Sequence, residues 1–109
     1  MRTMHLLALV VLAIASALPQ PAAAQSRFFT VERNIDRPGR DIMTGAPSPD
    51  AAACSFTCQL SNQCRAFTFV RPGVQGPFGM CWLKNAVPRA VRNSCCTSGV
   101  RRGAPVRID

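Results

Sequence analysis

The chain has 109 residues, a formal net charge of +8 and six cysteines, but one histidine and no tyrosine. This length suits one small domain, whose apolar core alone would be marginally stable. The only histidine, His5, lies in a segment that we expect to be removed, which excludes Ser–His and Cys–His nucleophile pairs and His-ligated metals. The five acidic residues are scattered and form no evident pair for acid–base chemistry. We therefore expect no enzymatic activity, no catalytic residue, no metal site and no cofactor.

The N-terminal segment 1–24 has the organisation of a secretion signal. Arg2 and His5 give a polar start, residues 6–18 form an apolar run, and residues 22–24 are alanines suited to cleavage. The run is shorter than the roughly 20 residues that span a bilayer. We therefore predict a cleaved signal peptide at 1–24 and a single domain at 25–109 with short flexible ends. The mature protein would have no transmembrane segment and would be secreted or periplasmic.

The first predicted element after the signal is a strand at Phe28–Asn34, which has aromatic and β-branched residues. Residues 35–47 contain Pro38-Gly39 and Gly45-Ala46-Pro47, which predict an ordered, turn-rich loop. We predict a helix at Pro49–Ser61, with Ser48 as its N-cap.

That helix has two apolar sets that do not share one face. Cys54 and Cys58 lie on one side, whereas Ala52, Phe56 and Leu60 fall nearly opposite at about 100° per residue. One of the two faces must therefore contact something other than the sheet.

A hairpin is predicted next. Residues 65–71 alternate Phe67 and Phe69 against smaller residues, which favours a strand whose two faces meet different surroundings. A Gly/Pro-rich loop at 72–79 leads to a partner strand at Met80–Lys84, where we expect Trp82 in the core. Residues 85–94 are predicted as a connection, 98–102 as a last strand and 103–109 as a tail.

The six cysteines all lie after the expected signal. An even number of cysteines in a small exported domain indicates a disulfide framework rather than a metal site. Six cysteines allow 15 pairings, and the spacing alone does not choose among them.

The ordered set of motifs resembles the PAN/apple domain family, especially short bacterial secreted members, over nearly all of the expected mature chain. The matching elements are Asp36-x-Pro38-Gly39-x-Asp41, Cys54-x-x-x-Cys58, Cys64-Arg65-Ala66-Phe67-Thr68-Phe69, Cys81-Trp82-Leu83-Lys84 and Cys95-Cys96-x-Ser98-Gly99-Val100. The resemblance implies a small disulfide-rich α+β fold, a twisted antiparallel sheet with one helix packed across it. It also implies the disulfides Cys54–Cys81 and Cys58–Cys64.

Cys95 and Cys96 depart from the family pattern, because the N-terminal strand lacks the cysteine that usually pairs with a C-terminal one. Three states stay open for them: a disulfide between the two neighbours, two free thiols, or a bridge to another chain.

The resemblance implies a non-catalytic module that binds protein or carbohydrate ligands. Eleven of the 12 basic residues after the signal are arginines, which suit anionic ligands such as acidic glycans. Aromatic residues are few and none interleaves with a basic run in a known motif, which disfavours nucleic acid for an exported protein. Two alternatives are a thiol-redox or redox-sensing protein acting through Cys95-Cys96, and a structural envelope protein dimerised by disulfides. The oligomeric state stays open.

The candidate ligand-binding residues are of two kinds. Basic side chains flank the predicted strands and would form an anion-binding surface, and two aromatic side chains would be exposed beside it. These candidates are Arg65, Arg71, Lys84, Arg89 and Arg101, together with Phe56 and Phe78.

Overall fold

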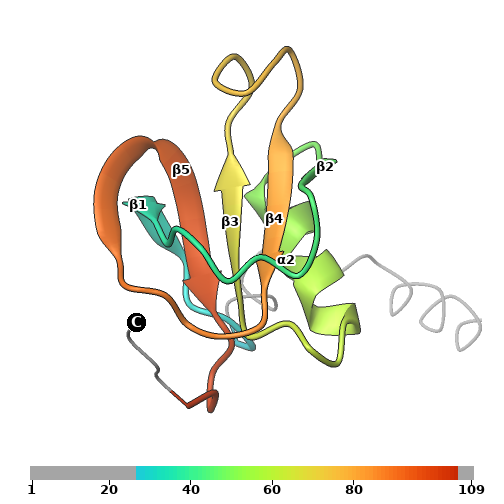
Figure 1. The fold of residues 1–109 in the computed structure, drawn as a ribbon, viewed down its shortest axis with the longest axis vertical. Coiled ribbons are helices and arrows are strands. Elements are labelled where there is room, and N and C mark those ends of the chain that lie inside the picture. Colours follow the sequence, from blue (N-terminus) through green and yellow to red (C-terminus); the bar gives the residue numbers. More distant parts are fainter. Residues whose placement is uncertain (1–26, 106–109) are drawn as a thin grey trace, which may run out of the picture.

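Within residues 27–105, five strands form one antiparallel sheet in the order β1–β5–β3–β4–β2, with one helix across one face (Figure 1). The structure is a computed structural model that describes residues 27–105, so the expected signal peptide lies outside the described residues. The elements are β1 (Glu32–Asp36), β2 (Ala46–Pro47), α2 (Ala51–Leu60), β3 (Ala66–Val70), β4 (Met80–Lys84) and β5 (Val91–Val100). The predicted small disulfide-rich α+β fold is confirmed.

Helix α2 begins later than predicted, because Asp50 and not Ser48 is its N-cap. The Asp50 carboxylate accepts a hydrogen bond from the Ala53 backbone N–H at 2.8 Å, whereas the Ser48 hydroxyl donates to the Asp50 carbonyl. The face with Cys54 and Cys58 is buried against the sheet. The opposite face, with Phe56, is exposed, which resolves the conflict between the two apolar sets.

Two disulfides join α2 to the sheet region with the pairing that the resemblance implied. Cys54 is bonded to Cys81 in β4, and Cys58 to Cys64 just before β3, each with a Cα–Cα distance of 5.3 Å. Their sulfurs lie in one cluster with Phe29, Phe67 and Phe69. Disulfides thus supply much of a core that a domain of this size would otherwise have to build from apolar side chains.

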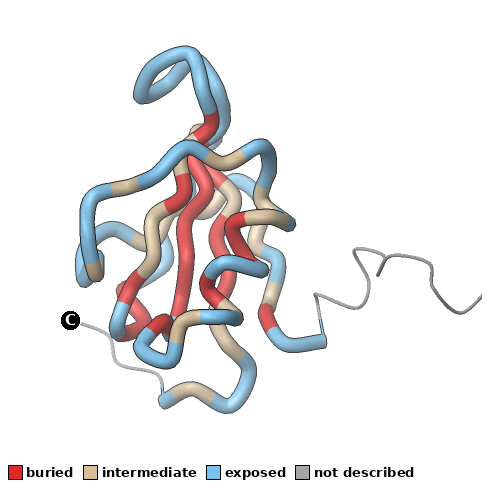
Figure 2. Tube along the Cα trace, turned by 90° about the vertical axis from the view of Figure 1, so that its right-hand side faces the viewer, coloured by how far each residue is buried: buried red, intermediate tan, exposed pale blue. Residues whose placement is uncertain are grey.

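The two faces of the sheet have different surroundings. Figure 2 shows that buried residues gather in the middle of the molecule, while the loop between β3 and β4 is exposed. Phe67 and Phe69 of β3 belong to the core on the helix side, whereas Thr68 lies on the opposite face. The alternation predicted for this strand is therefore confirmed.

Two strand predictions were wrong in their bounds. The first strand begins at Glu32 rather than Phe28, although Phe29 still forms an isolated bridge with Arg101. The last strand begins at Val91, within the predicted connection, because β5 is long enough to pair with both β3 and β1. Its first four residues are exposed, so no alternation of polar and apolar residues marked them as a strand.

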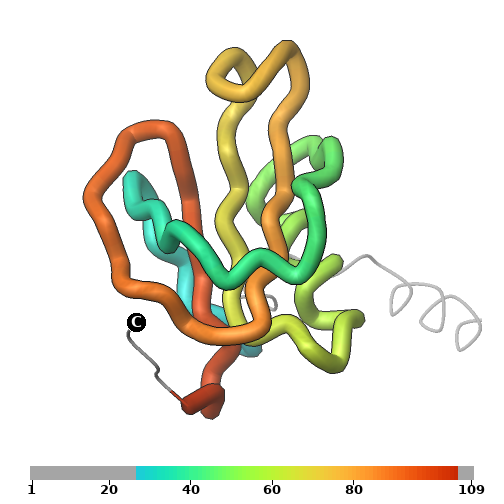
Figure 3. The backbone as a smooth tube through the Cα atoms, in the orientation of Figure 1, coloured from blue at the N-terminus to red at the C-terminus, as the bar shows by residue number. Residues whose placement is uncertain are grey.

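The segment 37–45, which we call the strap, crosses the face of the sheet that α2 leaves uncovered (Figure 3). Backbone hydrogen bonds hold it: the Ile42 N–H donates to the Leu83 carbonyl, and the Asn85 N–H donates to the Arg40 carbonyl. Arg40 has φ 60° beside Gly39 at φ 93°, a left-handed pair that turns the chain toward β4. The predicted turn-rich loop is therefore an ordered covering of the sheet.

No helix within residues 27–105 is both long and apolar enough to cross a membrane.

Candidate functional site

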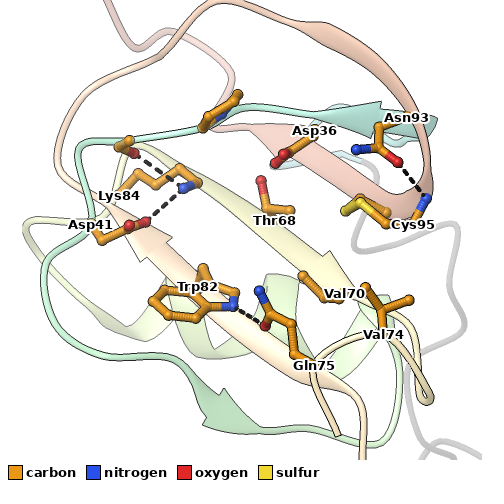
Figure 4. Close-up of a pocket in the computed structure, with 13 residues that line it drawn as sticks. Asp36, Asp41, Thr68, Val70, Val74, Gln75, Trp82, Lys84, Asn93 and Cys95 are labelled. Atoms are coloured by element: carbon orange, nitrogen blue, oxygen red, sulfur yellow. Dashed lines mark hydrogen bonds and ion pairs between the residues drawn. A yellow bond between two sulfur atoms is a disulfide. The ribbon is translucent and has the colours of Figure 1, made fainter.

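A hollow of about 440 Å³ lies on the open face of the sheet, on the side away from α2. Thr68, Val70 and Trp82 form its floor (Figure 4). Its walls come from the strap with Asp36, from the loop after β3, and from Asn93, Cys95 and Cys96 of β5. We call this hollow the sheet-face pocket. Three segments far apart in the sequence therefore meet around one short strand.

A buried hydroxyl pair lies beneath the pocket and ties the start of the strap to the sheet. The Ser98 hydroxyl donates to the Ile35 carbonyl at 2.8 Å, so its own oxygen accepts the hydrogen bond that joins it to the Thr68 hydroxyl, also 2.8 Å. Thr68 Oγ1 in turn accepts from the Arg37 backbone N–H. Both hydroxyl protons of this hydrogen-bonded pair have an acceptor, which removes the cost of burying the pair.

Arg37 adds a second tie at the same end of the strap. Its guanidinium makes a bidentate ion pair with Glu32, with both N–O distances 2.8 Å, and donates to the Pro88 carbonyl. A planar guanidinium suits this arrangement, because its fork matches the two carboxylate oxygens. These contacts join the start of the strap, which forms the pocket wall near Thr68, to β1 and to the connection before β5.

Lys84 does not belong to an exposed basic surface, which corrects the prediction made for it. Its side chain is 3% exposed, and its Nζ donates to Asp41 Oδ1 at 2.6 Å and to the Gly39 carbonyl at 3.1 Å. Lys84 shares its face of β4 with Trp82, so the strap covers it and supplies both acceptors. The charge of Lys84 is therefore paired with Asp41 inside the protein.

Trp82 lines the pocket and is only partly buried, so its predicted place in the core was wrong. Strand alternation puts Cys81 and its disulfide on the helix side and Trp82 on the other. The indole N–H donates to Gln75 Oε1 at 2.9 Å. A Cβ at Gly45 would collide with the indole ring, so the strap backbone lies directly against it.

The Cys95–Cys96 pair forms one end of the pocket, and in the structure the two residues are bonded to each other. They lie where the pairing of β5 with β1 is interrupted: Arg33 pairs with Thr97 and Ile35 with Arg92, so one residue of β1 faces four of β5. The Asn93 side chain accepts a hydrogen bond from the Cys95 N–H. All six cysteines are in disulfides.

The remaining basic candidates do not converge on one surface. Arg65 and Arg71 are exposed at opposite ends of β3, about 20 Å apart along a strand. Arg71 donates to the Ser94 carbonyl, and Arg89 is exposed in the connection between β4 and β5.

Arg101, another of the predicted ligand-binding residues, makes contacts that hold the fold. Its guanidinium donates to the carbonyls of Cys58, Ser61 and Cys64 at the end of α2, and it lies 5.0 Å from the centre of the Phe29 ring. Burial, followed by repulsion from Arg65, lowers the pKa of Arg101.

The two aromatic candidates are exposed but lie apart. Phe56 is 48% exposed on the outer side of α2, and Phe78 is 65% exposed in the loop between β3 and β4. Phe78 lines a shallow hollow with prolines on the helix side of that loop, and neither residue lines the sheet-face pocket.

Sequence reasoning missed Asp36, Thr68, Gln75 and Asn93 as pocket residues. Asp36 and Thr68 carried a signal, because they lie in the Asp-x-Pro-Gly-x-Asp and Cys-Arg-Ala-Phe-Thr-Phe motifs. Gln75 and Asn93 are polar residues in a loop and an irregular strand segment, and only the fold brings them to the pocket.

Residues 35–84 match the family model described as PAN domain, a range that runs from within β1 to the end of β4. No curated protein and no solved structure matches the chain significantly.

Proposed function

We propose, from the match of residues 35–84 to the PAN domain family model, that the chain is an exported, non-catalytic binding module whose ligand is a carbohydrate. The proposal locates the ligand in the sheet-face pocket. PAN domains in general bind proteins or carbohydrates and have no catalytic activity of their own. Three disulfides fit an oxidising compartment, where such bonds persist.

The observation that carries the proposal is the composition of the pocket. A partly exposed indole, Trp82, lies in it together with the carboxylate of Asp36 and the amides of Gln75 and Asn93. Sugar rings present an apolar face to aromatic rings and hydroxyl groups to carboxylates and amides. The volume of about 440 Å³ falls within the range of small-ligand sites.

The charges in the pocket also favour an uncharged ligand over an anionic one. The one cation lining it, Lys84, is paired with Asp41, so Asp36 leaves the pocket locally acidic in a chain of net charge +8. An anionic glycan would instead bind exposed arginines outside the pocket, such as Arg65, Arg71 or Arg89.

The experiment is a titration of the exported protein with neutral oligosaccharides and, separately, with a sulfated glycan. Trp82 is the only tryptophan and the chain has no tyrosine, so intrinsic fluorescence reports on the pocket itself. We expect a neutral oligosaccharide to change the emission in a manner insensitive to salt. Gln75→Ala should weaken binding roughly two- to twelvefold, the value of one neutral hydrogen bond.

Phe56→Ala is the matched control, because Phe56 is exposed on the opposite side of the sheet and should leave binding unchanged. Binding only of the sulfated glycan, weakened by salt and by Arg65→Ala or Arg71→Ala, would refute the pocket and favour the basic surface.

A further inference from the structure

We propose that, once its disulfide is reduced, the Cys95–Cys96 pair combines with Asp36 to form a binding site for a thiophilic divalent cation such as Zn²⁺ or Cd²⁺. The proposal goes beyond the carbohydrate binding argued above and does not depend on it. Among residues 27–105, these three residues form the one group whose ligand atoms, a carboxylate oxygen and two sulfurs, all lie within 4.8 Å of one another.

The backbone explains why the three ligand atoms meet. Asp36 pairs with Val91 at the start of β5, and the interruption of the ladder returns the chain so that Val70 of β3 pairs with Cys96. The side chains of Asp36 and Cys95 therefore reach the same end of the sheet-face pocket (Figure 4). This placement also leaves room for a cation beside them, because the pocket is open above.

The Asp36 carboxylate has no hydrogen bond or ion pair in the described part of the chain that would give it a structural role. By contrast, Asp41 is held by Lys84, Glu32 is held by Arg37, and Asp50 caps α2. Asp36 is thus the acidic group of the pocket that is available to a cation.

The chemistry of this donor set is specific. Two thiolates and one carboxylate are ligands that Zn²⁺ accepts in a four-coordinate site, with the fourth position left for water or another ligand. The disulfide itself is not such a ligand, so reduction must come first. A dithiol reductant gives two electrons and two protons to the disulfide and becomes a disulfide, and the cation then displaces both thiol protons.

Exposure makes selective reduction feasible. Cys54, Cys58 and Cys64 are fully buried, whereas Cys95 is partly exposed at the pocket. A thiolate can therefore reach the sulfur of Cys95 while the helix disulfides stay closed.

The test uses exported protein treated briefly with a dithiol reductant, freed of it without oxygen, and titrated with Cd²⁺. We expect one Cd²⁺ per chain, with the ultraviolet absorption of a cadmium thiolate, and no such absorption from oxidised protein. Alkylation followed by peptide mapping should find Cys95 and Cys96 as the labelled cysteines. Labelling of the other four first would overturn the premise of selective access, and with it the proposal.

Three variants decide which atoms bind. Cys95→Ser with Cys96→Ser should abolish the absorption, and Asp36→Asn should weaken Cd²⁺ binding by at least about tenfold, the loss that even an outer-shell partner causes. Asp50→Asn is the matched carboxylate control, because asparagine caps a helix about as well as aspartate. Unchanged absorption in the double variant, or equal affinity in Asp36→Asn and Asp50→Asn, would overturn the three-ligand site.

Discussion

Replacing Asp41 should destabilise the protein more than replacing its partner Lys84, because only one of the two charges is buried. The side chain of Lys84 is 3% exposed and that of Asp41 is 35% exposed. Asp41→Ala leaves a buried ammonium with only the Gly39 carbonyl as acceptor. Lys84→Met leaves a carboxylate that water can reach, and methionine fills much of the space of the lysine stem.

The magnitudes follow from burial. Breaking a fully buried ion pair from one side costs about 3–5 kcal/mol, and partial access of water to the site of Asp41 reduces this to about 2–3 kcal/mol. Lys84→Met should cost no more than about 1 kcal/mol. The variant that carries both changes has no buried charge, so it should be more stable than Asp41→Ala alone by roughly 1 kcal/mol or more.

Chemical denaturation with the disulfides intact measures these differences, and Trp82, which lies in the same pocket, provides the fluorescence signal. Two results would refute the reasoning. One is a greater loss of unfolding free energy in Lys84→Met than in Asp41→Ala. The other is additivity, in which the double variant is as unstable as the sum of the single changes.

Two further predictions concern polar groups that hold the fold. Arg101→Lys keeps the charge but loses the planar fork at the end of α2, so it should lower the unfolding free energy by about 1–3 kcal/mol and speed amide exchange in the last helical turn. Arg89→Lys, at an exposed position, should change stability by less than about 0.5 kcal/mol in the same denaturation assay. Thr68→Val should cost about 1–3 kcal/mol, because the Ser98 hydroxyl loses a hydrogen-bond donor and the Arg37 N–H loses its acceptor, and Thr68→Ser should recover most of that loss in thermal unfolding.

The sequence predicted the helix side of the protein better than the open face. Cysteine spacing, a short helix and two alternating strands are local patterns, and the disulfide pairing came with the family resemblance. The two strand starts that were predicted wrongly, Phe28 instead of Glu32 and Ser98 instead of Val91, lie on exposed or irregular pairings. There the neighbouring strand, rather than side-chain alternation, decides where the ladder begins.

The candidate site could not be predicted from charge and aromatic content alone. Lys84 and Arg101 lie beside strand residues just as Arg65 and Arg71 do. The side chains of Lys84 and Arg101, however, donate hydrogen bonds to carbonyls or a carboxylate inside the fold. Whether a cation faces water depends on what crosses above it, here the strap and the end of α2. That relation joins residues more than 35 positions apart in the chain.

The two faces of the sheet have different roles, which explains why a pocket can exist in so small a domain. Disulfides and aromatic side chains on the helix side supply the core, so the open face is not needed for apolar burial. It carries Thr68 and Lys84 instead: the strap donates the Arg37 N–H to Thr68, and it offers the Gly39 carbonyl and the Asp41 carboxylate to Lys84. The strap is therefore held by polar ties that leave space above Trp82 unfilled. Under the proposed function, a ligand entering this space would meet walls that are already in place, and its binding would need little ordering of the chain.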